Sequence, residues 1–205
     1  GDLPLNVYFV KWGNVKTFKS HPHGKELIMN LYSSGDFFGF EPILENENYR
    51  ESAVAMQDSE LVAIPRHDFM LMIQSHPDVS KSFINLLCKK VADREAQLLN
   101  LAYNSVRQRT AEALLKAETL KDSRDIIAIS RDDLAKMVGT ASESVIRVLS
   151  DFKDEGLIEI ETQDVGGVEV LTIDVLASDA EEEEPDFENM SEQEMEEYVP
   201  SFENQ

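Results

Sequence analysis

The chain has 205 residues, a formal net charge of −21 at pH 7 and 42% hydrophobic residues, which suffices for one large or two small globular domains. A single cysteine, Cys88, excludes an intrachain disulfide, a zinc knuckle and a four-cysteine iron–sulfur site. No stretch approaches the roughly 18 apolar residues of a membrane span, so we expect a cytoplasmic protein. Cys88 lies in an apolar helical run, where we expect it to be buried.

Residues 1–76 show the alternating apolar and polar pattern of short β-strands. VYFVKWGNVKTFK contains two β-rich runs around Gly13, KELIMNLYSSGDFFGF turns at SSGD, and Pro65 ends a further run. Turn signals about every 8–12 residues predict an antiparallel sheet structure. Because few strands are available to close a barrel or sandwich, we expect that the opening strands of this sheet lie upstream in a longer polypeptide.

From residue 77 the apolar positions change to the alternating three- and four-residue spacing of a long helix. The positions of this seam are Ile84, Leu87, Val91, Arg94, Leu98 and Leu101. Polar neighbours flank the seam, so we expect residues 77–101 to be a dimerisation helix. Packing of this helix on the chain's own sheet is the alternative. A further helix is expected from Val106 to about Leu120.

Residues 130–156, SRDDLAKMVGTASESVIRVLSDFKDEG, contain two short helical patterns separated by a glycine. Ser130 is the predicted N-cap of the first helix, with Asp133 reaching back as a variant of the capping box. Gly139 is expected to end this helix in the left-handed conformation. Thr140 is predicted to cap the second helix through a T-x-x-E box.

The second helix has an apolar and a polar face. Val145, Val148, Leu149 and Phe152 follow the spacing of one buried face, which leaves Arg147 on the exposed side. The next residues, LIEIETQDVGGVEVLTID, read as two strands that form a wing. This order predicts a winged helix-turn-helix over residues 102–177, a fold that places its second helix in the major groove of DNA.

Arg147 is the best candidate for a bidentate contact with guanine, worth about 1–3 kcal/mol of discrimination. Glu143 either completes a cap or accepts from a cytosine amine, and Asp151 is an alternative partner for Arg147 at i+4. The remaining candidates for DNA contact are Ser130, Arg131, Thr140, Ser142, Ser144 and Lys153. Residues 130–156 contain more acidic than basic side chains, which predicts weak non-specific binding because few phosphates are neutralised.

The last residues of the sequence are strongly acidic. Residues 179–205 contain 12 Asp and Glu and no Lys or Arg, so we expect an acidic disordered tail over residues 178–205. A solubilising tail is the simple interpretation. The alternative is that the tail competes with DNA phosphates for the Arg147 face, since charges interact over about 8 Å at physiological salt.

The chain resembles the Crp/Fnr family of bacterial transcription regulators over about residues 1–175. The resemblance lies in GNVKTFK, GKELIMNLYSSGDFFG, HPDVSKSFINLLCKKVADREAQLLNLAYNSVRQRTAEALL and ISRDDLAKMVGTASESVIRVLSDFKDEGLIEI. It implies an α+β fold: a partial cyclic-nucleotide-binding-type β-roll, a long dimerisation helix and a C-terminal winged helix-turn-helix. It also implies a homodimer on a palindromic DNA site, with recognition helices about 34 Å apart, and contact with RNA polymerase.

The resemblance carries over only part of the family's effector site. The family has Gly-Glu after the aromatic pair, whereas here Gly39 is followed by Phe40 and Glu41 comes one place late. Arg50 reaches the phosphate-binding position, but Glu51 stands where a small hydroxyl is expected. We therefore expect an input other than cyclic AMP.

On the long helix, Arg94 and Glu95 replace the paired hydroxyls that grip the purine in the family. The candidate effector pocket therefore comprises Gly39, Glu41, Arg50 and Arg94. The cysteine set of the oxygen-sensing branch is absent, and His21 and His23 are expected to be exposed hairpin residues. We expect no cofactor and no metal site.

In the second helix Glu143 and Arg147 match the family's base-reading positions, while Ser142 departs from a common Arg, so the DNA half-site should differ from the best-known consensus. We therefore predict a sequence-specific DNA-binding transcription regulator. We do not expect an enzyme, because no glycine-rich phosphate loop, zinc-ligand spacing or nucleophile–histidine grouping is present. A protein-interaction module that uses its winged helix without DNA is the alternative. A further hypothesis is that an upstream segment, such as a phosphoacceptor receiver domain, supplies the signal.

Overall fold

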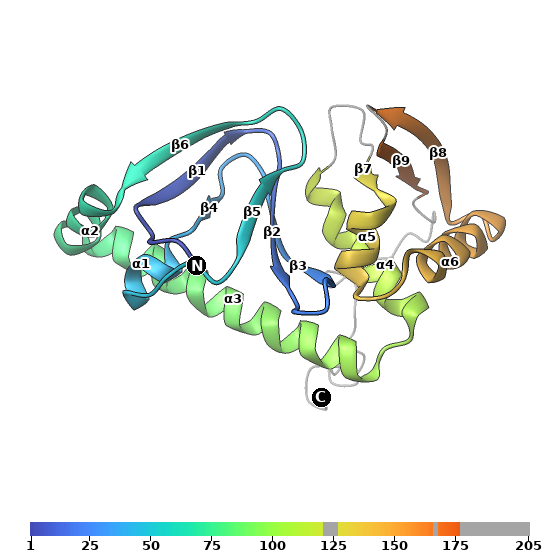
Figure 1. Cartoon of the computed structure of the whole chain (residues 1–205), viewed down its shortest axis with the longest axis horizontal. Coiled ribbons are helices and arrows are strands. Elements are labelled where there is room, and N and C mark those ends of the chain that lie inside the picture. Colours follow the sequence, from blue (N-terminus) through green and yellow to red (C-terminus); the bar gives the residue numbers. More distant parts are fainter. Residues whose placement is uncertain (121–126, 166–167, 177–205) are drawn as a thin grey trace, which may run out of the picture.

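The computed structural model describes residues 1–120, 127–165 and 168–176. Figure 1 shows a β-roll and a helical domain with its own sheet, joined by one long helix that runs beneath both. The α+β fold class is confirmed, and every strand pair given for the described residues is antiparallel. The acidic tail and the tip of the wing lie outside the described residues. In the part described, no helix combines the length and the apolar character needed to cross a membrane.

The roll is built from two facing sheets. One has the strand order β4-β1-β6, with β4 at Phe37–Phe38, β1 at Asn6–Trp12 and β6 at Glu60–Pro65. The other has the order β3-β2-β5, with β3 at Glu26–Tyr32, β2 at Val15–Ser20 and β5 at Ser52–Ala55. A short helix, α1 (Glu41–Glu45), connects β4 to the segment that leads into β5.

Aromatic rings fix the long helix to the roll. α2 (Arg66–Ser75) follows β6, and α3 (Pro77–Tyr103) follows α2. Phe83 on α3 is 6% exposed, and its ring lies edge-on to three others at centroid distances of 5.0–5.6 Å: those of Phe37, Phe40 and Phe69. Such rings remove large apolar areas from water, so this contact stabilises the attachment of α3 to the roll.

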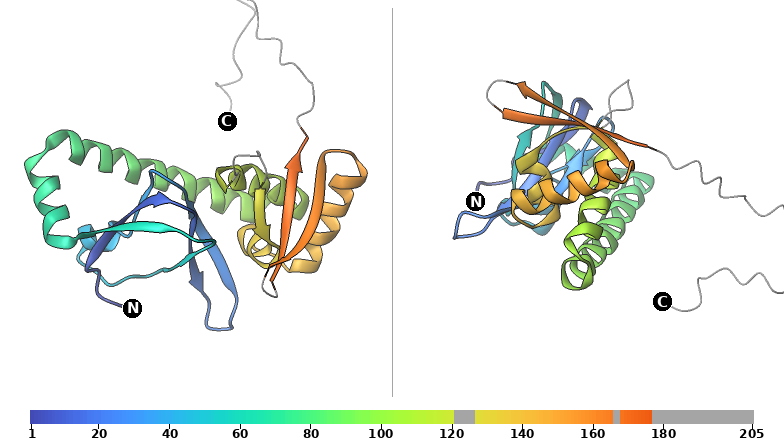
Figure 2. Two further views of the ribbon diagram at one scale, coloured as in Figure 1. Left: turned by 90° about the horizontal axis from the view of Figure 1, so that it is seen from above. Right: turned by 90° about the vertical axis from the view of Figure 1, so that its right-hand side faces the viewer.

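The C-terminal domain is a helix-turn-helix closed by a small sheet, which Figure 2 shows beside the far end of α3. Its helices are α4 (Val106–Ala117), α5 (Arg131–Val138) and α6 (Ser142–Asp154), with a 3-10 turn over Glu118–Leu120. Its strands are β7 (Ile127–Ser130), β8 (Ile158–Val165) and β9 (Val168–Val175), in the order β7-β9-β8. β7 was not predicted from the sequence.

Two of the three features predicted for the ends of α5 are confirmed: the Ser130 cap and the end of the helix at Gly139. The Ser130 hydroxyl accepts from the amide of Asp133 at 3.0 Å, and Gly139 ends the helix with φ +70°, as predicted. The carboxylate of Asp133 does not reach back to the cap, because it forms an ion pair with Lys16 on β2 instead.

The predicted Thr140 cap is wrong. The N-cap of α6 is Ala141, and no side chain caps this helix. The reason is that the amides of Gly139 and Thr140 both donate to the carbonyl of Ala135, at 2.9 and 3.2 Å, which makes Thr140 part of the turn that ends α5. Cys88 was also mispredicted: it is exposed, because it lies on the side of α3 that faces away from the roll.

We predict different effects for the two candidate capping residues. Ser130→Ala should lower the free energy of unfolding by about 1 kcal/mol, because the Asp133 amide loses its acceptor. Thr140→Ala is the matched control, and we expect a change within about 0.5 kcal/mol since no hydrogen bond is lost. Urea unfolding monitored by circular dichroism measures both. Equal losses in the two variants would contradict the cap assignment.

Candidate functional site

The second helix of the helix-turn-helix, α6, is anchored by one face and exposes the other. Val145, Leu149 and Phe152 are buried in the domain core, and Val148 packs against its edge. Arg147 projects to solvent and makes no ion pair with Asp151 or with any other residue that the structure describes. Its five donors are therefore available to a partner.

The other predicted DNA-contact residues surround this helix unevenly. Glu143 is exposed, whereas Ser142 and Ser144 are half-buried in the first turn of α6 and Thr140 lies in the preceding turn. Arg131 pairs with Glu169 at 2.7 Å and so lies against the wing, while Ser130 is occupied as a cap. Lys153 lies at the far end of α6, with its amine 3.5 Å from the carbonyl of Ile160.

Ion pairs attach α5 to the roll. Lys16 on β2 pairs with Asp133, and both side chains are largely buried, at 16% and 11% exposed. Lys136 contacts Glu26 on β3 at 2.7 Å and Asp132 at 2.6 Å. These hydrogen bonds raise the pKa of Lys136. The orientation of the helix-turn-helix relative to the roll is therefore set by charge pairs as well as by apolar packing.

The predicted seam of α3 divides into two sides. Ile84, Val91 and Leu98 are 58–67% exposed, which is high for apolar side chains and leaves this face without a partner in the described chain. Leu101 is 38% exposed. Leu87 instead packs against the core of the roll, and the Arg94 guanidinium donates to the carbonyl of Met29 on β3 at 2.8 Å.

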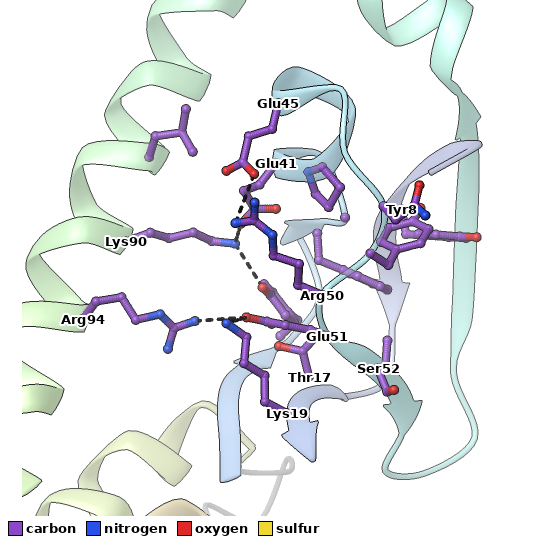
Figure 3. Close-up of a pocket in the computed structure, with 18 of the residues that line it drawn as sticks. Tyr8, Thr17, Lys19, Glu41, Glu45, Arg50, Glu51, Ser52, Lys90 and Arg94 are labelled. Carbon is purple, nitrogen blue, oxygen red and sulfur yellow. Dashed lines mark hydrogen bonds and ion pairs between the residues drawn. The ribbon is translucent and has the colours of Figure 1, made fainter. Parts of the chain in front are cut away.

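A cavity of about 810 Å³ lies between the roll and α3, and all four residues of the predicted effector pocket line it. Figure 3 shows Glu41 and Arg50 on the roll side and Arg94 on the helix side. Gly39 lies directly before Phe40, which is fully buried in the aromatic cluster. Glu41 follows in the first turn of α1.

Lys90, a polar neighbour of the α3 seam that the sequence pattern predicts to be solvated, instead lines this cavity from the helix side (Figure 3). Its amine pairs with Glu41, donates to the hydroxyl of Tyr32 at 3.0 Å and lies 4.9 Å from the ring centre of Phe40. Burial lowers the pKa of Lys90, but the charges and hydrogen bonds of Tyr32 and Glu41 outweigh this effect, so the pKa is raised overall. Burial is also the main cause of the raised pKa of Tyr32.

The remaining cations of the cavity also face carboxylates of the chain. Arg50 pairs with Glu47 and, at 3.5 Å, with Glu45. Glu51 lies 3.8 Å from Arg94 and 3.9 Å from Lys19. A bound anion would have to displace these carboxylates from the basic groups. Among the residues that the structure describes, no group of His, Cys, Asp or Glu could hold a metal ion, and His21 and His23 are exposed in the β2–β3 turn.

Two family models match the chain. Residues 1–76 match the cyclic nucleotide-binding domain, and residues 108–178 match the Crp-like helix-turn-helix domain. The cyclic AMP receptor protein of Thermus thermophilus is 32% identical over 160 residues, covering 78% of this chain and 74% of that protein. The transcriptional activator protein anr of Pseudomonas aeruginosa is 25% identical over 183 residues, covering 86% and 75%.

The fold is shared with solved structures. The structure of FixK2 from Bradyrhizobium japonicum aligns with a TM-score of 0.71 at 21% sequence identity, covering 86% of this chain and 91% of that one.

We predict that the Lys16–Asp133 ion pair, which links the roll to α5, contributes more to the free energy of unfolding than an exposed ion pair on the roll. Lys16→Met should lower the free energy of unfolding by about 3 kcal/mol, because Asp133 is left charged and largely buried. Lys11→Met is the matched control, since Lys11 pairs with Glu60 at an exposed position, and we expect a loss of at most about 1 kcal/mol. Chemical unfolding of both variants measures the two losses, and an equal loss in Lys16→Met and Lys11→Met would contradict the prediction.

Proposed function

The chain belongs to the Crp/Fnr family of DNA-binding transcription regulators, and on that basis we propose that it reads a palindromic site as a homodimer and responds to an input other than cyclic AMP. In this proposal residues 1–76 form the sensory roll, 77–101 the dimerisation helix and 102–177 the DNA-binding domain. We further propose that it acts in the cytoplasm and contacts RNA polymerase, which its family membership supports.

The observation that carries DNA recognition is the free guanidinium of Arg147 on an anchored helix. Three buried side chains fix α6 in the domain, so the direction of Arg147 is set before any partner binds. A bidentate guanidinium matches the O6 and N7 acceptors of guanine in the major groove. Glu143, one turn earlier on the exposed side, fits a contact with a cytosine amine.

The exposed side of α3 supports the homodimer. An apolar seam of this length on a helix that is already attached to its own roll fits a second copy of the same helix. The two-fold symmetry of such a pair would place two α6 helices on one duplex, which corresponds to a palindromic site.

The charge of the roll cavity supports an input other than cyclic AMP. A nucleotide phosphate binds where basic groups lack partners, but Arg50, Arg94 and Lys90 each face a carboxylate of the chain. Glu51 also adds negative charge at the position where the family resemblance implies a hydroxyl.

Replacing Arg147 tests base readout. With DNA fragments selected by the unmodified protein from a random pool, Arg147→Ala should weaken binding by about 1–3 kcal/mol, with little change on unselected DNA. Lys153→Ala is the control, and we expect an even, smaller weakening on both kinds of DNA. Electrophoretic mobility shifts measure the affinity of the unmodified protein and of both variants for selected and unselected DNA.

An unchanged ratio of selected to unselected binding in Arg147→Ala would contradict base reading by this residue. If the unmodified protein retains no fragment from the pool, the result favours the alternative of a protein-interaction module, which the acidic balance of residues 130–156 supports.

A charge placed on the seam of α3 should separate the dimer. We expect Leu98→Glu to sediment as a monomer, because two facing carboxylates would be buried without partners. Leu115→Glu changes a residue of similar exposure on α4 and should leave the dimer intact. Analytical ultracentrifugation compares the two, and a dimer of unchanged affinity in Leu98→Glu would place the interface elsewhere.

Cyclic AMP should not stabilise the protein. A ligand at 100 times its Kd adds about 2.7 kcal/mol to the free energy of unfolding, so about 1 mM cyclic AMP would reveal a Kd near 10 µM in a thermal melt. We expect no shift for the unmodified chain. A variant carrying Glu45→Gln, Glu47→Gln and Glu51→Ser frees the cations and should bind the nucleotide more tightly. Stabilisation of the unmodified chain would contradict the proposal.

A further inference from the structure

A second cavity, of about 400 Å³, lies where β3, α3, α4 and α5 meet. Its apolar lining comprises Ile28, Leu31, Ala96, Leu101, Ala113, Met137 and Val138. At 3.6 residues per turn, Ala96 and Asn100 lie nearly opposite Val91 and Leu98 on α3. Of the predicted seam residues only Leu101 lines this cavity, so a dimer formed through Ile84, Val91 and Leu98 leaves it open.

The charge of this junction cavity differs from that of the chain as a whole. Lys89, Arg109 and Lys116 line it together with two carboxylates, Asp93 and Glu112, so the lining is net positive in a chain of net charge −21. The oxygens of Glu112 already accept hydrogen bonds from the side-chain amides of Asn100 and Asn104. Its negative charge is therefore partly offset by these donors.

Arg109 is the distinctive group of the cavity. Its Nε is buried and has no hydrogen-bond partner, and its guanidinium forms no ion pair with any residue in the described ranges. A buried donor without an acceptor is rare in folded proteins and indicates that an acceptor is missing. The guanidinium is a fork of donors whose geometry matches a carboxylate or a phosphate.

Lys116 also lines this cavity. Partial burial and the nearby charge of Arg94 lower its pKa, while Asp93 acts in the opposite direction. A negative charge at Arg109 would act on this pKa in the same direction as Asp93.

We propose that the junction cavity binds a small organic anion, with an apolar body against Ala96, Leu101 and Met137 and a carboxylate or phosphate group that accepts from Arg109. The cavity size is within the usual range for small-molecule sites. Arg109 also lies beside the turn of the helix-turn-helix, since its Nη1 is 3.8 Å from where a Cβ on Gly139 would stand. A bound anion would therefore contact the roll, the long helix and the DNA-binding domain together.

Phenyl phosphate is a suitable probe, and Met137 provides a specific reporter. Met137 lines the junction cavity, whereas no methionine lines the cavity of the roll. In the 205-residue chain labelled with ¹³C at the methionine methyls, phenyl phosphate should cause a saturable shift of the Met137 signal, and the Met137→Leu variant assigns that signal. Phenol, which has the ring without the anion, should bind at least about tenfold more weakly.

Two variants remove the site in different ways. Arg109→Met removes the anion-binding group, and Ala96→Trp fills the cavity without changing charge; each should weaken the saturable shift at least about tenfold. Arg66→Met is the control, because Arg66 on α2 hydrogen-bonds Asn46 far from the cavity. Thermal melts show whether each variant folds.

No saturable shift in the unmodified protein, or an undiminished one in folded Arg109→Met or Ala96→Trp, overturns the proposal. DNA binding is not measured in this experiment, so its failure is distinguishable from a failure of the proposed regulator function.

Discussion

The rest of the structure depends on how Phe83 attaches the long helix to the roll. Its ring fits among those of Phe37, Phe40 and Phe69, and this contact sets the rotation of α3 about its own axis. Because helical residues keep a fixed angular relation, one anchored ring determines where every other side chain of α3 points. Lys90 and residues one turn away then face the roll, and the apolar seam faces outward.

The two cavities flank α3 and differ in their electrostatic character. In the roll, Lys90 and Arg94 meet carboxylates of the chain itself, so that cavity is neutralised from within. At the junction, Arg109 has no such partner among the described residues. If a ligand acts on this chain, the electrostatic attraction for an anion is therefore greater at the contact between domains than in the roll.

Much of the fold could be predicted from the sequence because its signals are local. The cap at Ser130, the end of a helix at Gly139 and the buried face of α6 each depend on neighbouring residues. The features that were not predicted depend on tertiary contacts. Asp133 pairs with Lys16, which lies on a strand far away in the sequence, and Lys90 lines a cavity that forms only when the roll folds. No local pattern distinguishes Lys90 from a solvated lysine on the same helix.

Gly139, in the turn between α5 and α6, lies close to both α3 and β3. Its φ of +70° disfavours any side chain, and an added Cβ would stand 3.1 Å from Leu101 at the end of α3 and 3.5 Å from Leu27 on β3. The turn that leads into α6 therefore lies against both the end of α3 and strand β3 of the roll. Because even a methyl group at this position would push the Leu101 side chain aside, a movement of α3 or β3 would press on this turn and alter the direction of α6.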